Sequence, residues 1–78
     1  RILVHEDIAE DFTSRVVELS RQVAFGDPLD PSTQVGAIVS EAHQGKIHGY
    51  VRDAAAQGAD VRLGGEALAV PGLTGQFY

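Results

Sequence analysis

The sequence predicts an α/β fold whose elements follow the order strand, helix, linker, helix and strand, with the start of a further strand at the end. Three observations support this prediction. A β-branched apolar run, RILVH, occupies residues 1–5. Two segments with apolar residues at helical spacing follow it, and a short alternating run, DVRL, occupies residues 60–63. Short apolar or alternating runs are typical of strands, whereas spacings of three and four are typical of helices.

The first helix is predicted to begin at Asp7, a favourable N-cap residue that has Glu10 three positions on as its capping-box partner. Apolar residues then recur at spacings of four, four, three and four. They are Ile8, Phe12, Val16, Leu19 and Val23. Such a stripe indicates a helix that covers a sheet. We expect Gly26 to end this helix in the left-handed region of backbone conformation.

The connection to the second helix, GDPLDPSTQVGAIVSEAH over residues 26–43, contains two Asp-Pro steps. Proline excludes the α region for the residue before it, so Asp27 and Asp30 should be extended and the connection stiff. Their carboxylates resemble calcium ligands, but the alternating oxygen spacing of a calcium loop is absent. Turn chemistry is therefore the preferred interpretation.

The second helix is predicted between an N-cap at Ser40 and a terminating Gly58. Its apolar residues at helical spacing are Ile47, Tyr50, Val51, Ala54 and Ala55. Two glycines, Gly45 and Gly49, lie inside it, each at a cost of roughly 1 kcal/mol relative to alanine. Two explanations are open: close packing of another helix or sheet, or access of a bound cofactor to the backbone.

The last predicted elements are strands at residues 60–63 and 75–78, which we expect to pair as antiparallel neighbours across a loop containing Pro71 and Gly72. The final strand then has an open edge. An open edge of this kind is a liability in a protein that folds alone.

Composition excludes two classes of partner. The formal net charge is −5 and only six basic residues are present, which argues against a sequence-independent grip on nucleic acid. No apolar run approaches the roughly 20 residues that span a bilayer. We therefore expect no nucleic acid and no membrane among the partners, and a soluble, cytoplasmic protein. The 78 residues form at most one domain, and chains of this size bury only about 60% of their unfolded surface.

Complete catalytic motifs are absent from the sequence. There is no cysteine, no serine in a strained Gly-x-Ser-x-Gly turn, and no phosphate-binding glycine loop. His43 and His48 are five residues apart, about 140° around a helix, and so cannot hold one metal ion together. We predict no catalytic residue and no metal ligand. What remains is His43, Lys46 and Tyr50, which share one side of the second helix and, on spacing alone, form a solvated or half-buried face.

The order of these segments resembles the aldehyde dehydrogenase superfamily. The resemblance is carried by RILVHEDIAEDF, GDPLDPSTQVGAIVSEAH, KIHGYV and AQGADVRLGGE, and it extends over essentially all 78 residues. It is greatest with the branch that oxidises betaine aldehyde and muconic-type semialdehydes. The resemblance implies that residues 1–78 are a fragment of the catalytic domain, beginning just downstream of the catalytic cysteine.

The resemblance also implies a function for the parent protein. That function is NAD(P)-dependent oxidation of an aldehyde to a carboxylic acid through a cysteine thioester. The catalytic cysteine and the general-base glutamate would lie outside residues 1–78, so the fragment alone is expected to be inactive. The partners implied are the remainder of the parent enzyme, a small-molecule aldehyde and further copies in a homo-dimer or tetramer. Family positions that match Lys46 and His43 lie near the nicotinamide ribose, which makes both residues candidates for binding NAD or NADP.

Two departures from the family pattern accompany these candidates. Ala37 stands where many members have proline, and Gln44-Gly45 lowers the helix propensity just before Lys46. The alternative function is a non-catalytic, acidic α/β interaction module derived from the family. A regulatory ligand-binding domain ranks third, because so short a chain hardly encloses a pocket. The particular aldehyde and the choice between NAD and NADP stay open.

Overall fold

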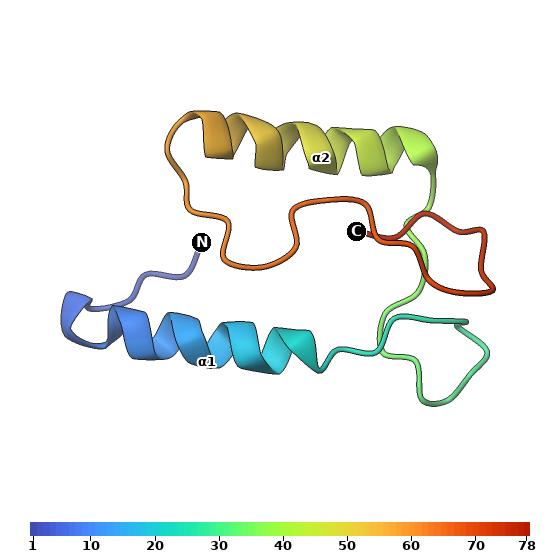
Figure 1. Cartoon of the computed structure of the whole chain (residues 1–78), viewed down its shortest axis with the longest axis horizontal. Coiled ribbons are helices and arrows are strands. Elements are labelled where there is room, and N and C mark those ends of the chain that lie inside the picture. Colours follow the sequence, from blue (N-terminus) through green and yellow to red (C-terminus); the bar gives the residue numbers. More distant parts are fainter.

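The computed structural model describes residues 1–78, and its regular elements are helical (Figure 1). A 3₁₀ turn, η1 (Glu6–Ile8), leads into helix α1 (Ala9–Arg21), and helix α2 (Glu41–Ala56) follows a long connection. The two helices make no contact with each other. In Figure 1 the extended segment that follows α2 runs back between them. Neither helix combines the length and the apolar character needed to cross a bilayer.

The predicted helix α1 is confirmed, but its capping residue is not Asp7. The chain enters through η1, and the His5 imidazole accepts a hydrogen bond at 3.2 Å from the backbone N–H of Asp7. Asp7 therefore lies inside the 3₁₀ turn, and Ile8, which precedes α1, provides no side-chain cap. The capping-box prediction was wrong because the His5 imidazole, and not the Glu10 side chain, accepts from the Asp7 N–H, while the Glu10 carboxylate is bonded to Arg62.

Helix α1 also ends earlier than the sequence predicted. Its last residue is Arg21, and Gly26 has an ordinary negative-φ backbone rather than the predicted left-handed one. Gly26 serves a different purpose in the connection: its N–H donates to Val35 O at 3.1 Å, which closes the loop. A Cβ atom at this position would lie 2.6 Å from Thr33 Oγ1. Glycine is required here for close approach, not for a positive φ.

The two Asp-Pro steps form turns, as predicted. Asp27 Oδ1 accepts a hydrogen bond from the N–H of Leu29 at 2.9 Å. Asp30 Oδ1 accepts from the N–H and the hydroxyl of Ser32, at 2.8 and 2.7 Å. The hydrogen bond from the Ser32 N–H, with the hydroxyl second, lowers the pKa of Asp30. Each carboxylate thus spans its proline and stiffens the connection.

Both predicted ends of α2 are confirmed. Ser40 Oγ accepts a hydrogen bond at 3.1 Å from the N–H of His43, which is the geometry of an N-cap. At the other end Gly58 has φ +95° and donates its N–H to Ala55 O at 3.0 Å. The left-handed glycine allows the chain to turn away from the helix axis.

The predicted strands are absent from this structure. Residues 1–5 and 60–63 take part in no β-bridge, and residues 75–78 form only two isolated ones, Ile38 with Gln76 and Leu68 with Phe77. The antiparallel pairing of 60–63 with 75–78 was therefore wrong. A strand requires a neighbour that completes its hydrogen-bond ladder, and the chain places none beside residues 1–5. Leu3 in this apolar run is 94% exposed.

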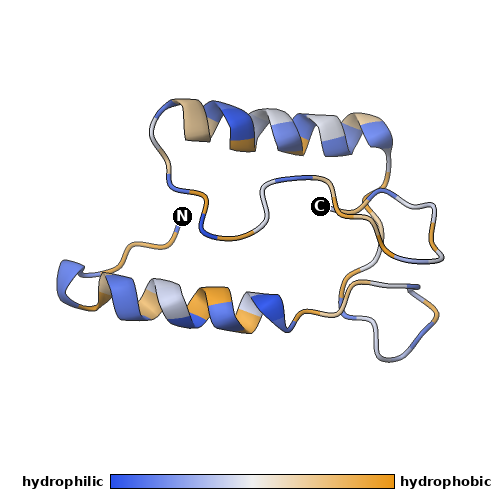
Figure 2. Cartoon of the chain, viewed as in Figure 1, coloured by the Kyte–Doolittle hydropathy of each residue, from blue (hydrophilic) through white to orange (hydrophobic).

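The chain leaves most of its apolar surface uncovered. Its accessible surface is 6439 Å², whereas a compact protein of this mass exposes roughly 4,600 Å². Its radius of gyration is 14.6 Å, against about 11.5 Å for a compact domain of this length. Phe77 is the single buried residue, at 2% exposure, and the predicted apolar stripe of α1 is open, with Leu19 59% exposed. Apolar stretches in α1 and in the N-terminal segment are visible in Figure 2.

The close approach at Gly26 generates a prediction. We expect Gly26→Ala to lower the opening free energy of the 24–35 loop by about 1–3 kcal/mol, because the new Cβ overlaps a stiff threonine side chain. Hydrogen exchange at the Val35 amide, which donates to Ala24 O at 3.0 Å, measures this change. Adding Thr33→Ala should restore most of the loss.

Gly36→Ala is the matched control for this prediction. A Cβ at Gly36 would meet only Pro28 Cβ, at an ordinary contact distance of 3.7 Å. It should therefore leave the exchange of the Val35 amide nearly unchanged. Equal effects of the two substitutions would contradict the assigned role of Gly26.

Candidate functional site

The candidate site is the exposed side of the first half of α2. Helical spacing places His43, Lys46 and Tyr50 on this side, and all three are exposed. Gln44 and Ile47, on the side that faces the rest of the chain, are half-buried instead. The helix thus has an anchored side and a free side, and the two predicted cofactor residues belong to the free side.

The polar groups of the free side are available to a ligand. Lys46 forms no ion pair, and its Nζ lies 6.0 Å from the centre of the Tyr50 ring. Its ammonium group can therefore offer donors to a hydroxyl or phosphate oxygen. The His43 backbone N–H is used by the cap at Ser40, while its imidazole makes no hydrogen bond. Apart from this contact of Lys46 with the Tyr50 ring, the three side chains form no hydrogen bond or ion pair within the chain.

The two glycines inside α2 are open. A Cβ built at Gly45 or at Gly49 meets no atom within 4 Å. No part of residues 1–78 packs closely against them. Both explanations of these glycines, close packing and cofactor access, therefore place the neighbouring group outside the 78 residues.

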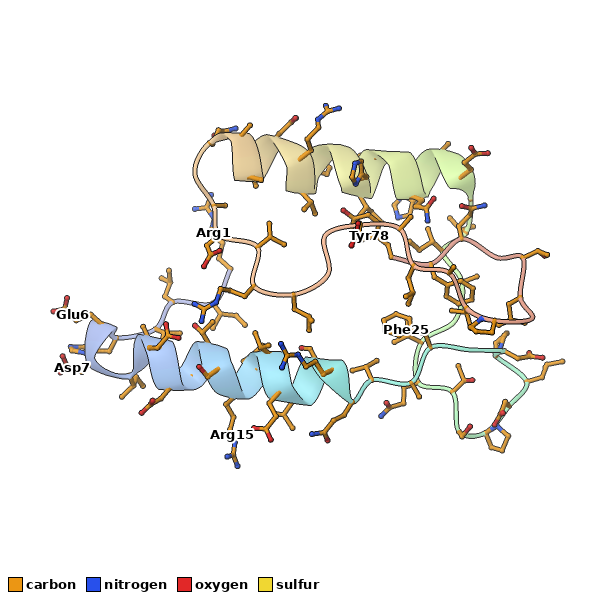
Figure 3. The ribbon with its side chains drawn as sticks, in the orientation of Figure 1. Arg1, Glu6, Asp7, Arg15, Phe25 and Tyr78 are labelled. Carbon is orange, nitrogen blue, oxygen red and sulfur yellow. The ribbon has the colours of Figure 1, made fainter.

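The anchored side of α2 is attached to the C-terminal residues. Phe77 O accepts hydrogen bonds from Gln44 Nε2 at 2.7 Å and from Leu68 N at 3.0 Å. One turn further along α2, His48 Nδ1 is hydrogen-bonded to Tyr78 Oη at 3.1 Å, with the two rings edge to face at 5.9 Å. Tyr78 lies below α2 in Figure 3. These contacts set how α2 is turned about its own axis.

Sequence reasoning missed the anchoring roles of Gln44 and His48. The sequence pattern indicates only a lowered helix propensity at Gln44-Gly45 and no shared metal ion for His43 and His48. The available signal was the i, i+4 spacing of Gln44 and His48, which puts both polar side chains on one face of a helix. The structure keeps His43 and His48 on different sides, and no group of three or more His, Asp or Glu side chains is arranged to hold a metal ion.

The hollows of the surface lie elsewhere. One, of about 440 Å³, lies between α1 and residues 60–63, and another, of about 710 Å³, lies between the end of α1 and residues 63–68. Neither is lined by Lys46 or His43. Because ligand sites are concave, a site built on the free side of α2 needs a second wall from outside this chain.

A second charged cluster joins α1 to the segment after α2. Arg62 donates to both carboxylate oxygens of Glu10, at 2.7 and 3.3 Å, and lies 3.6 Å from Asp60 Oδ2. The hydrogen bond from Arg62, with the charge of the guanidinium second, lowers the pKa of Glu10. The carboxylate is held in its ionised form, which suits a structural ion pair and not proton transfer near neutral pH.

Fold and site together define a chain with an open polar surface and open apolar faces, not one with an enclosed catalytic pocket. The chain belongs to the aldehyde dehydrogenase family, since the model of that family, described as "Aldehyde dehydrogenase family", matches residues 1–78. The family resemblance noted in the sequence is thereby confirmed.

Named relatives agree with this assignment. Betaine aldehyde dehydrogenases of Brucella ovis and Brucella canis are each 40% identical over 78 residues, covering 100% of this chain and 16% of the relative. The Staphylococcus aureus betaine aldehyde dehydrogenase in complex with NAD+ is 30% identical, with a TM-score of 0.93 over 100% of this chain and 16% of that one. An NAD-dependent aldehyde dehydrogenase of Sinorhizobium meliloti is 44% identical, with a TM-score of 0.85 over 96% and 14%. The chain thus spans about one sixth of the length of these Brucella and Staphylococcus proteins.

The Glu10–Arg62 pair yields a prediction about pH. The folded-state pKa of Glu10 is depressed, so its stabilising contribution is present above the unfolded pKa and is lost as pH falls through the folded pKa. In Arg62→Gln the pKa of Glu10 should rise towards the ordinary value of 4.5 for a glutamate. Side-chain carboxyl chemical shifts followed through a pH titration measure this change.

Arg15→Gln is the control for this titration, because Arg15 points away from the rest of the chain (Figure 3). It removes one positive charge, as Arg62→Gln does, but from α1 and without touching the Glu10–Arg62 pair. An unchanged Glu10 titration in Arg62→Gln, or the same rise in Arg15→Gln, would contradict the assignment.

Proposed function

We propose that this chain is part of the catalytic domain of an NAD-dependent aldehyde dehydrogenase, which oxidises an aldehyde to a carboxylic acid. The observation that carries the proposal is the match of all 78 residues to the aldehyde dehydrogenase family. It is supported by the backbone similarity to an enzyme in complex with NAD+. The chain contains no cysteine, so the thioester would be formed by a residue outside it, and the isolated chain would be inactive.

The contribution of this chain is to bind and orient the cofactor. The chemistry of the residues fits this role, since Lys46 offers an unpaired ammonium group and His43 an unbonded imidazole to ribose hydroxyls. The bound dinucleotide supplies the hydride acceptor. Lys46 and His43 hold the ribose, while the remainder of the parent protein provides the other wall of the site. We propose NAD rather than NADP as the cofactor, because one similar solved structure is in complex with NAD+ and another is named as NAD-dependent.

The alternative is a non-catalytic, acidic interaction module derived from the same family. The open apolar stripe of α1 is the observation that favours it, because such a face suits docking to another protein. The two functions differ in what the free chain does. A module would fold cooperatively by itself, whereas a part of a catalytic domain depends on the parent protein.

The proposed function is tested with the full-length parent protein. It should oxidise aldehydes with NAD, and Lys46→Ala should weaken NAD binding roughly 10-fold through the loss of a charge-assisted hydrogen bond, leaving the KM for the aldehyde nearly unchanged. Titration calorimetry measures the NAD affinity and steady-state kinetics the KM. His43→Ala should weaken NAD binding less.

Arg52→Ala is the control, since Arg52 is an exposed cation of α2 that pairs only with its neighbour Asp53. It should alter neither constant. A parent protein that oxidises no aldehyde with NAD would refute the proposed function. An active parent in which Lys46→Ala binds NAD normally would remove only Lys46 from the site.

A further inference from the structure

Gln44 makes the one side-chain hydrogen bond between α2 and the buried residue of the structure. Its Nε2 donates to Phe77 O at 2.7 Å across 33 residues of sequence. Phe77 is 2% exposed, so protein groups have to satisfy this carbonyl, and Leu68 N supplies its second hydrogen bond at 3.0 Å. The contact thus joins α2 to the one buried residue of the chain.

Gln44 and Lys46 point in opposite directions from the helix. Two residues at 100° each place them about 200° apart around the axis. The link to Phe77 on one side therefore determines where the Lys46 ammonium group stands on the other. The other side-chain link of this face, His48 with Tyr78, lies one turn further from the start of α2 and is exposed. Gly45, which follows Gln44 directly, has no neighbour within 4 Å of a built Cβ. Within this turn Gln44 thus makes the one side-chain hydrogen bond to the C-terminal residues, while Ser40 caps the helix from within.

We propose that Gln44 is a positioning residue for cofactor binding: its hydrogen bond to the Phe77 carbonyl sets the rotation of α2 and thereby directs Lys46 and His43 towards the dinucleotide. The proposal rests on the proposed function. Gln44 itself touches no cofactor, because its side chain is occupied on the anchored side. Its effect is transmitted through the backbone of a single helical turn.

The test compares variants of the full-length parent enzyme. Gln44→Met keeps the length of the side chain and removes the N–H donor, and Gln44→Glu removes the donor while keeping the shape. In both, the KM for NAD should rise about 3- to 10-fold, as expected for one lost hydrogen bond. The kcat and the KM for the aldehyde should change less than about 2-fold, and Arg52→Gln on the same helix should change none of the three.

A double-mutant cycle separates positioning from a general loss of stability. If Gln44 acts through Lys46, then Gln44→Met should raise the KM for NAD much less in a Lys46→Ala background than in the wild-type background. Additive effects would overturn the proposal, as would an unchanged KM for NAD or loss of folding in both Gln44 variants. A wild-type parent without NAD-dependent aldehyde oxidation would instead refute the proposed function, so the two failures are distinguishable.

Discussion

The carbonyl oxygen of Phe77 is the point on which this structure depends. It joins α2, through Gln44, to the segment around Leu68, and the neighbouring Gln76 O accepts from Ile38 N at 2.6 Å at the approach to α2. The two helices do not touch each other. The Glu10–Arg62 pair is the side-chain link that ties α1 to the segment after α2. A junction of hydrogen bonds, not a hydrophobic core, holds α2 in place.

A chain held mainly by hydrogen bonds leaves much of its apolar surface exposed to solvent. Its surface exceeds that of a compact protein of equal mass by about 1,800 Å², the difference between 6439 Å² and roughly 4,600 Å². A standard protein interface covers about 800 Å² on each partner. The excess is therefore larger than two such interfaces, and it includes the apolar stripe of α1 and the run at residues 1–5. This agrees with a chain that spans 16% of the length of its Brucella relatives, and with a candidate site on α2 that has no second wall within the chain.

The sequence predicted those features whose cause lies within a few residues. Ser40 and Gly58 delimit α2 because each bonds to backbone groups three residues away. Features with distant causes were missed or misassigned. Gly26 looked like a helix end, but the loop brings Thr33 against it. Residues 1–5 have the composition of a strand but no partner within the chain, and the bond of Gln44 to Phe77 spans 33 residues. The helix that carries the candidate site was predictable, while its orientation was not.

The central claim is that protein outside residues 1–78 covers these open faces. Hydrogen exchange of residues 1–5 and α1 tests it most directly, measured in the isolated chain and in the full-length parent under the same conditions. The account predicts fast exchange in the isolated chain and strong protection of the same amides in the parent. Strong protection already present in the isolated chain, with a cooperative unfolding transition of a monomer, would contradict it.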